Sequence, residues 1–220
     1  MVTKVVILGA SGGCLDTIDI INEINKFHKN KYEIIGLLED NTELKKNKFS
    51  GFSIIGDMSD VNKIDQDIKI VNALGSEKNF YKKENLILNT LKIDKNRLET
   101  LIHPQANIAQ SVVVGGGSII YQNVSIGRNV TLGHNVVVLP HSFIGHDSEI
   151  GDFSILNAGV AVSGNVNIAS NCYIGTNTCI KNNIDIEGRS LIGMGSNVTK
   201  NIKSNSINYG NPCKFIENLF

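Results

Sequence analysis

The chain has no excess of either charge and no long run of apolar residues. Its 21 Lys and Arg side chains balance 21 Asp and Glu side chains, so the formal net charge is zero. A basic surface is what draws a protein to nucleic acid or to an anionic membrane, and this composition does not provide one. No apolar stretch approaches the roughly 18 residues of a transmembrane helix. We therefore expect neither a nucleic-acid partner nor a membrane partner.

Paired cysteines and a secretory leader are also lacking. None of the four cysteines has the CxxC spacing of redox or zinc motifs. Residues 1–4 lead straight into a short apolar run that ends at Gly9, which does not resemble a signal peptide. We expect a protein of the reducing cytoplasm.

What the chain does contain is a column of aliphatic residues spaced by six, without a gap or an insertion. The seventeen members are Ile102, Ile108, Val114, Ile120, Ile126, Leu132, Val138, Ile144, Ile150, Leu156, Val162, Ile168, Ile174, Ile180, Ile186, Ile192 and Val198. A helix repeats its apolar face every 3.6 residues and an amphipathic strand every 2, so neither explains this period. A fixed short period indicates stacked repeats.

A second column, four residues after the first, consists almost entirely of small or β-branched residues, from Ala106 to Ser196. One large and one small inward position in each hexad suit short strands that wind round a triangular prism. Three hexads make one coil of 18 residues, and coils stack at the inter-strand spacing of roughly 4.8 Å. Asn and Gly are expected at the corners, where a positive φ lets the chain turn sharply. A β-sandwich, the alternative fold, would show turn signals about every 8–12 residues instead.

The first hundred residues follow a different pattern, in which strands alternate with helices. Apolar runs at 4–8, 32–38 and 68–74 predict buried strands, and residues 15–28 and 77–92 predict helices. This alternation is typical of βαβ units and a parallel sheet. We therefore predict an α/β domain at residues 1–100 and an all-β domain, a parallel β-helix with a C-terminal tail, at residues 101–220.

Candidate ligand-binding residues follow the predicted strands of the first domain. Ligands of parallel sheets bind at the carboxyl ends of the strands. A glycine-rich turn that opens a helix can present backbone N–H groups to a phosphate, and a carboxylate after the next strand can accept from a ribose hydroxyl or a base N–H. The candidates are Gly9, Ser11, Gly12, Gly13, Glu39, Asp40 and Gly75. Because the turn lacks a full GxGxxG, a tight strand–helix turn without a ligand is the alternative interpretation.

From Lys4 to about Phe215 the chain resembles the bacterial nucleotide-sugar acetyltransferases of cell-surface polysaccharide biosynthesis. This group includes N-acetyltransferases for amino-sugar nucleotides, and sialic acid O-acetyltransferases are close relatives. The resemblance rests on the hexads, on Glu39-Asp40, on the turn Gly9-Ala10-Ser11-Gly12-Gly13-Cys14 and on the closing Gly210-Asn211-Pro212-Cys213-Lys214. It implies a Rossmann-like nucleotide-binding domain, a hexapeptide-repeat left-handed β-helix and a homotrimer. Gly13 stands where the family often has His, so any contact made by that His is absent.

His146 is the catalytic candidate. It follows an inward aliphatic by two residues, and the equivalent residue one coil later is Gly164, which leaves a recess beside the imidazole. The stretch 142–154 resembles the family's catalytic segment, with Asp147 where the family has Glu. An amine attacks a thioester only when neutral, and imidazole, with an unperturbed pKa of about 6.5, suits the removal of its proton. The resemblance implies His146 as general base and Asp147 as the residue that orients it.

The resemblance also implies acetyl-CoA as co-substrate, bound in the groove between the β-helices of neighbouring subunits. Carried over position by position, the contacts are Ile155, Gly164, Thr176, Met194 and Gly195. Ile155 stands where some relatives place a second His. Direct transfer requires no metal, and we expect none.

Three other functions remain open. The acceptor could be a hydroxyl group of a sialic-acid-like sugar instead of an amine. A γ-class carbonic anhydrase also uses this β-helix and holds zinc with three His across a subunit interface, two of them spaced as His141 and His146 are. The third zinc ligand has no clear match in His103 or His134. A trimer that serves only as a scaffold is the non-enzymatic alternative.

Overall fold

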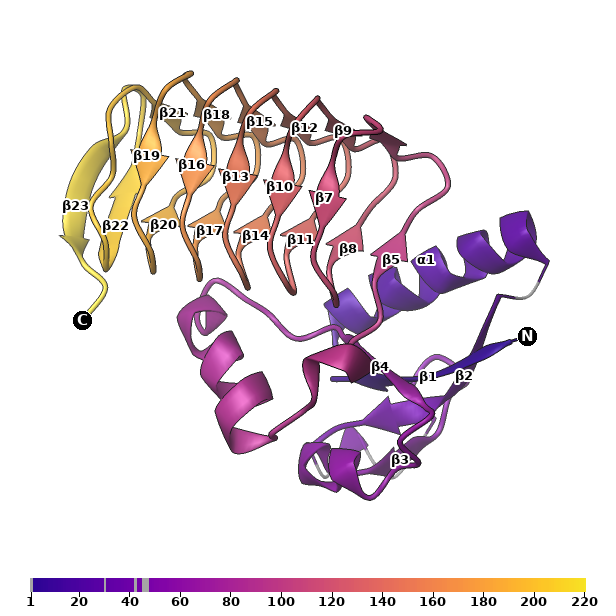
Figure 1. Cartoon of the computed structure of the whole chain (residues 1–220). Helices are drawn as coiled ribbons and strands as arrows, with labels where there is room; N and C mark the ends of the chain where they lie inside the picture. The colour runs from indigo at the N-terminus through magenta and orange to yellow at the C-terminus, as the bar shows by residue number, and fades with distance from the viewer. Residues whose placement is uncertain (1, 30, 42, 45–47) are drawn as a thin grey trace.

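The computed structural model describes residues 2–29, 31–41, 43–44 and 48–220 (Figure 1). A small parallel sheet with its helices forms the N-terminal part, and a prism of short strands forms the rest, starting at β5 (Leu101–Ile102). Figure 1 shows the N-terminal part lying under the first coils of the prism, with the last coils extending beyond it. Within the described residues, no helix combines the length and the apolar character needed to cross a membrane.

The N-terminal sheet has four parallel strands in the order β3-β2-β1-β4. Its elements are β1 (Thr3–Leu8), α1 (Gly12–His28), β2 (Tyr32–Leu38), β3 (Ile54–Gly56) and β4 (Lys69–Asn72). Successive side chains of β1 point to opposite faces. Val5 and Ile7 pack in the core that contains the apolar face of α1, whereas Val6 and Leu8 pack in a second core on the other side. Both faces of the sheet are therefore covered, as in Rossmann-like domains.

Two sequence predictions for this part need correction. The strand expected at 68–74 is shorter, because β4 ends at Asn72. The helix expected at 77–92 is a 3₁₀ turn, η3 (Phe80–Lys82), followed by a π-helix, η4 (Asn85–Thr90), whose wide turn closes with a 2.8 Å bond from Leu91 N to Leu86 O. Helical periodicity does not distinguish α-turns from π-turns in so short a segment. The three-residue β3 was not predicted, since it is too short to show alternation.

The prism consists of three parallel sheets, here called faces 1, 2 and 3, that the chain visits in turn; only β23 runs antiparallel, against β22. Face 1 contains β5, β8 (Ile119–Ile120), β11 (Val137–Val138), β14 (Ile155–Leu156), β17 (Tyr173–Ile174), β20 (Leu191–Ile192), β22 (Ser206–Tyr209) and β23 (Lys214–Asn218). Face 2 contains β6 (Asn107–Ile108), β9 (Ser125–Ile126), β12 (Phe143–Ile144), β15 (Ala161–Val162), β18 (Cys179–Ile180) and β21 (Asn197–Val198). Face 3 contains β7 (Val113–Val114), β10 (Thr131–Leu132), β13 (Glu149–Ile150), β16 (Asn167–Ile168) and β19 (Asp185–Ile186).

Strand pairing confirms the 18-residue coil. Val137 pairs with Ile155 and Ile144 with Val162, one coil later in each case. From Ile120 to Val198 the aliphatic column is at most 2% exposed, so it forms the core of the prism. Ile102 is 40% exposed instead, because it lies in the first coil and no coil precedes it. The architecture is the predicted left-handed β-helix.

The serines of the second column are buried and fully bonded. Ser142 Oγ donates to the carbonyl of Asn157 at 2.9 Å and accepts from the amide of Val160 at 3.2 Å. Ser148 and Ser154 make the equivalent bonds to the next coil. A buried hydroxyl is costly only when it lacks partners. These serines therefore tie successive coils together at no desolvation penalty.

From Val114 to Ile192, the corner that follows each aliphatic contains a residue with positive φ, three positions after the aliphatic. The set is Gly117, Asn123, Asn129, Asn135, His141, Asp147, Phe153, Gly159, Asn165, Asn171, Asn177, Asn183, Arg189 and Gly195. Asn and Asp tolerate this conformation better than other side-chain residues do, which explains the asparagines. The glycines directly after the aliphatic have another cause: a Cβ on Gly145 would lie 2.6 Å from the amide nitrogen of Gly164 in the next coil.

The corner between faces 3 and 1 attaches the prism to the N-terminal domain. Phe153 has a φ of 59° and is fully buried in the second core of that domain, with Val6 and Leu8. A bulky residue rarely adopts this conformation, so packing must offset the strain. Asn135 and Asn171 occupy the same corner and bond Asn72 and Glu84 of the N-terminal domain.

Lys83 is buried at this junction, only 3% exposed, and its Nζ lies 3.5 Å from the carbonyl of Asn135. Burial lowers its pKa from 10.5 to about 8. Below pH 8 both the folded and the unfolded chain hold the proton, and the native state bears the full cost of a buried ammonium, on the order of 3 kcal/mol. As pH rises toward 10.5 that cost disappears, because the native state releases its proton first.

We therefore expect Lys83→Met to be more stable than the wild type by a margin that is constant below pH 8 and shrinks as pH approaches 10.5. Urea unfolding of both proteins at a series of pH values measures the margin. Lys82→Met is the matched control, since it makes the same substitution at a neighbouring exposed lysine and should lack the stabilisation gained by removing a buried ammonium. The same margin for Lys83→Met at every pH would contradict the prediction.

Candidate active site

His146 and Asp147 lie together at the corner between faces 2 and 3, after β12 ends at Ile144. His146 Nδ1 lies 2.7 Å from Asp147 Oδ2, so the shorter acidic residue does reach the imidazole. Asp147 is one of the positive-φ corner residues, with a φ of 57°. The imidazole side chain is 63% exposed and is therefore open to a ligand.

Asn129, one coil earlier on the same corner, fixes the carboxylate. Its Nδ2 donates to Asp147 Oδ1 at 2.9 Å. The Asn129 amide and, after it, the His146 imidazole hold the pKa of Asp147 below its ordinary value. An ionised carboxylate only accepts hydrogen bonds, so a neutral His146 donates from Nδ1 and keeps its lone pair on Nε2. The arrangement leaves Nε2 available as a proton acceptor on the side of the Gly164 recess.

Gly164 lies directly against this imidazole. A Cβ added to Gly164 would lie 2.7 Å from both Cε1 and Nε2 of His146. No side chain can occupy that position unless the ring moves. The ring position therefore depends on Asp147 on one side and on the absence of a side chain on the other.

The residues predicted to bind a nucleotide lie along one edge of the N-terminal sheet. Gly9 follows β1, and Gly12 and Gly13 open α1. Glu39 is tied to this turn, because its Oε2 accepts from the amide of Ala10 at 2.7 Å and its Oε1 from the amide of Asn41 at 3.0 Å. Asp40 accepts from the amide of Met58 at 2.8 Å. Both carboxylates thus have backbone partners in this structure.

A cleft of about 130 Å³ separates this edge from face 1 of the prism. It is lined by Gly13, Asp16, Asn72 and Gly75 on one side and by Tyr121, Leu139, Ile155, Asn157 and Tyr173 on the other. β1 is flanked by β2 and β4, so the cleft opens where the strand order reverses, the usual ligand position in such sheets. A Cβ on Gly75 would come within 2.9 Å of Ile155 Cδ1, which shows how closely the two domains approach.

The residues predicted to contact acetyl-CoA do not meet within one chain. Thr176, Met194 and Gly195 lie together at the corner between faces 1 and 2, where the Gly195 amide donates to the Thr176 carbonyl. Gly164 lies at a different corner, beside His146. Ile155 is only 6% exposed and packs with Phe80 and Leu191 between the prism and the N-terminal domain.

Three lining residues of the cleft, Tyr121, Leu139 and Asn157, were missed from the sequence although a signal for them exists. Together with His103 they are spaced by 18 and directly follow an aliphatic of face 1, a position that Gly175 and Gly193 occupy in later coils. Only the first four coils have a large side chain at this position, and these are the coils that face the N-terminal domain.

His141 lies at the corner between faces 1 and 2, with a φ of 63°, and so does not share a corner with His146. In the neighbouring coils the equivalent corner positions are occupied by Asn123 and Gly159. Within the described ranges, no group of three or more His, Cys, Asp or Glu residues is arranged to hold a metal ion.

Residues 4–84 match the family model described as the PglD N-terminal domain. No curated protein sequence matches the chain. The whole chain resembles the acetyltransferase domain of PglB from Neisseria gonorrhoeae FA1090, solved in complex with acetyl coenzyme A, with a TM-score of 0.83 and 24% identity over 98% of this chain and 100% of that one.

Two further solved structures share the fold. PerB from Caulobacter crescentus, in complex with CoA and GDP-perosamine, has a TM-score of 0.82 and 17% identity over 99% of each chain. WeeI from Acinetobacter baumannii AYE has a TM-score of 0.81 and 22% identity over 97% of this chain and 100% of its own. The match of residues 4–84 and the fold of the whole chain agree with the resemblance to the bacterial nucleotide-sugar acetyltransferases that the motifs indicated.

Proposed function

We propose that this chain is an acetyl-CoA-dependent N-acetyltransferase that acts on the amino group of a nucleotide-linked amino-deoxy sugar. The observation that carries the proposal is the imidazole of His146, bonded to Asp147 and open beside Gly164, in a chain whose N-terminal domain is of the PglD type. A β-helix scaffold alone would not need an exposed imidazole held by a carboxylate that is itself held by Asn129.

In this reaction His146 acts as general base. Its Nε2 accepts the proton of the sugar amine as the nitrogen attacks the thioester carbonyl, and the imidazolium that forms is stabilised by Asp147. The tetrahedral intermediate then collapses: the carbon–sulfur bond breaks, and the imidazolium returns its proton to the departing CoA thiolate. One amide bond forms for each thioester broken, and no covalent enzyme intermediate is needed.

The proposed binding sites divide between the two domains. The nucleotide is proposed to lie at the carboxyl ends of β1, β2 and β4, with Gly9, Ser11, Gly12 and Gly13 offering backbone N–H groups to the diphosphate. The remaining candidates of that edge are Glu39, Asp40 and Gly75. Acetyl-CoA is proposed to lie along the prism, in contact with Ile155, Gly164, Thr176, Met194 and Gly195.

Because the proposed acetyl-CoA contacts occupy different corners of one prism, a single chain does not complete the site. A cyclic homotrimer would place one corner of a subunit opposite a different corner of its neighbour, and closed cyclic assembly is common for such chains. The four cysteines, all free, fit a cytoplasmic enzyme. We therefore propose a cytoplasmic homotrimer with one site at each interface.

The test is an assay on the purified assembly. Light scattering coupled to size exclusion is expected to give three times the 23.9 kDa chain mass. That fraction should release CoA thiol from acetyl-CoA when given a UDP-, GDP- or dTDP-linked 4-amino-4,6-dideoxyhexose. A fully active monomer would contradict the trimer, and no thiol release across the panel would contradict the N-acetyltransferase.

The same preparation separates the alternatives. Thiol release with a sialic acid, but with no amino sugar, would identify an O-acetyltransferase. Stoichiometric zinc together with CO₂ hydration would identify a carbonic anhydrase that uses His141 and His146. An unchanged melting temperature with acetyl-CoA would favour a scaffold, because a ligand of the native state must raise stability.

A further inference from the structure

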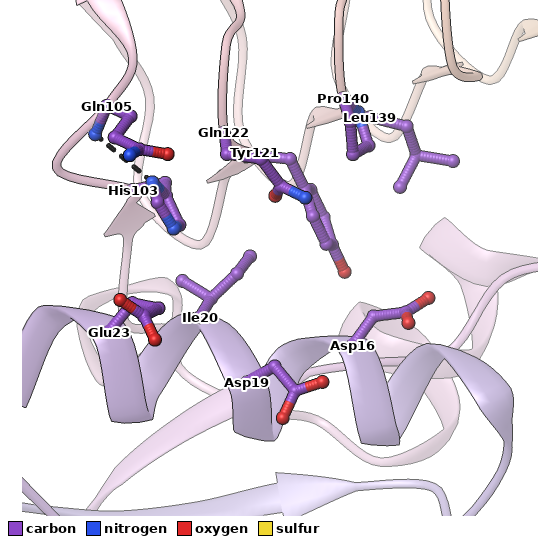
Figure 2. Close-up of a pocket in the computed structure, with 10 residues that line it drawn as sticks. All are labelled: Asp16, Asp19, Ile20, Glu23, His103, Gln105, Tyr121, Gln122, Leu139 and Pro140. Atoms are coloured by element: carbon purple, nitrogen blue, oxygen red, sulfur yellow. Dashed lines mark hydrogen bonds between the residues drawn. The ribbon is translucent and has the colours of Figure 1, made fainter.

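A second pocket, of about 350 Å³, lies between α1 and the first coils of the prism (Figure 2). Asp16, Asp19 and Glu23 line it from α1, where a spacing of three and four residues puts them on neighbouring positions of the helix surface. In Figure 2 Asp16 and Glu23 lie on the side toward the prism, and Asp19 lies at the front of the helix. His103 and Tyr121 line it from the prism. This pocket, here called the α1 pocket, is not used by the catalytic pair.

The α1 pocket is strongly acidic. Among the described residues only Glu23 of the three carboxylates forms an ion pair, with the exposed Lys26 at 2.6 Å. Three carboxylates on one helix face repel phosphate and attract a cation. An acidic helix face by itself is an ordinary solvated surface, so a ligand needs a further indication.

His103 provides that indication. Its side chain lies among the buried polar groups, with 6% exposure, yet only Nδ1 has a partner: it accepts from the amide of Gln105 at 3.1 Å. In Figure 2 the other ring nitrogen points away from that bond, into the pocket above α1. Since Nδ1 accepts, a neutral His103 carries its proton on Nε2 and offers a donor. Burial lowers its pKa, against the opposing charge of Glu23, which favours this neutral form.

The α1 pocket continues the cleft at the sheet edge. Both are lined by Asp16, Tyr121 and Leu139. The charge that α1 favours changes along its length. The N-terminus at Gly12 favours a phosphate, through its free N–H groups and the helix dipole, whereas the carboxylates that begin one turn later favour a cation. A ligand that is anionic at one end and cationic and hydroxylated at the other matches this sequence of charges.

We propose that the α1 pocket binds the hexose of the acceptor, with Asp19 and Glu23 recognising its protonated amino group and His103 donating to a ring hydroxyl. The inference rests on the proposed function and deepens it, because it makes the α1 pocket the part of the protein that distinguishes an amino sugar from its hydroxy analogue. The carboxylates act in recognition, before the amine loses its proton to the catalytic base.

The test compares binding of three probes by calorimetry without acetyl-CoA: GDP-perosamine, GDP-rhamnose, which has a hydroxyl in place of the amine, and GDP. The corresponding dTDP and UDP series are used if GDP does not bind. A hydrogen bond to a charged group contributes about 1.5–3 kcal/mol, so the wild type should prefer the amino sugar about ten- to hundredfold. Asp19→Asn and Glu23→Gln should each reduce that preference at least several-fold and leave the affinity for the nucleoside diphosphate unchanged.

Asp67→Asn is the matched control, because it removes one exposed carboxylate of the same domain outside the pocket. It should keep the preference. Asp19 and Glu23 are exposed, so both variants should melt as the wild type does. His103→Phe, which removes the ring donor, should weaken both sugar nucleotides equally and leave GDP binding intact.

The outcomes separate the inference from the proposed function. If the wild type acetylates an amino sugar but Asp19→Asn and Glu23→Gln keep its preference for the amine, the α1 pocket is not the hexose site and the enzymatic proposal stands. If the preference exists and both variants abolish it while no acetyl transfer occurs, the pocket stands and the enzymatic proposal fails. Equal wild-type affinity for amino and hydroxy sugars overturns the inference in either case.

Discussion

His146→Ala is expected to lower the turnover of acetyl transfer by about 10²–10⁴, the usual contribution of a general base. The imidazole is the group that Asp147 and Asn129 hold in place, through bonds of 2.7 and 2.9 Å, and its atoms are the nearest to a Cβ built on Gly164. Without it, the ammonium that forms on attack has no positioned proton acceptor. Steady-state rates at saturating acetyl-CoA and acceptor measure the loss.

Binding and stability should be unaffected by the same substitution. The His146 side chain is 63% exposed, so its removal leaves no cavity, and the melting temperature should stay within about a degree or two of the wild type. Acetyl-CoA affinity should also survive. Asp147→Asn is the informative companion, because Asn keeps the positive-φ corner but removes the charge that stabilises the imidazolium, and should cost less than His146→Ala. Wild-type turnover in His146→Ala would refute the mechanism and make His141 the next candidate.

Gly164→Ala is expected to lower turnover by about 10²-fold, because displacing a catalytic group by an ångström has an effect of that size. A Cβ at this position would lie 2.7 Å from Cε1 and Nε2 of His146, which is closer than real contacts permit. Gly164 does not have a positive φ, so its backbone accepts a side chain, and the exposed ring can swing aside. The protein should therefore fold normally with its base misplaced.

Gly164→Leu should extend the effect to the co-substrate. Its longer side chain would project over the imidazole, where acetyl-CoA is proposed to lie, so acetyl-CoA affinity should fall along with turnover. Calorimetry with acetyl-CoA and a melting curve give the two readings. Lost affinity with an unchanged melting temperature supports the proposed groove, whereas unchanged affinity would show that acetyl-CoA lies elsewhere.

The chain offers a matched control for both substitutions. Gly116 has the same hexad position as Gly164 and also lies one coil from a histidine, His134. A Cβ at Gly116 would lie 3.5 Å from His134 Nδ1, an ordinary van der Waals distance. Gly116→Ala should keep both turnover and melting temperature. A similar loss in Gly116→Ala would mean that glycine itself, and not the position of His146, matters at these corners.

Much of the fold follows from periodicity. The six-residue column, read with the small column beside it, predicts the prism, its coil length and its stacking register, because each strand pairs only with its equivalent one coil away. The same register places Gly164 next to His146. The asparagines expected at the corners are confirmed, and Asn123, Asn129 and Asn135 show the same six-residue period.

The N-terminal domain is less fully predictable. Its strands and α1 follow from apolar runs and helical spacing, but the turns of residues 80–90 do not, because 3₁₀ and π turns differ from the α-helix in their hydrogen bonds and not in their composition. Sequence motifs place Glu39 and Asp40 at the sheet edge, yet only the structure shows that both carboxylates already bond backbone amides.

The sequence by itself determined the two kinds of domain, the coil register and the position of Gly164 one coil above His146, because these depend on repeats. The structure was needed to show that the shorter Asp147 side chain reaches the imidazole. Only the tertiary structure decided how the domains meet. Phe153 in the N-terminal core, Gly75 against Ile155, and His103 above the carboxylates of α1 join residues far apart in the chain. Such contacts depend on the relative position of two domains, which no local period encodes.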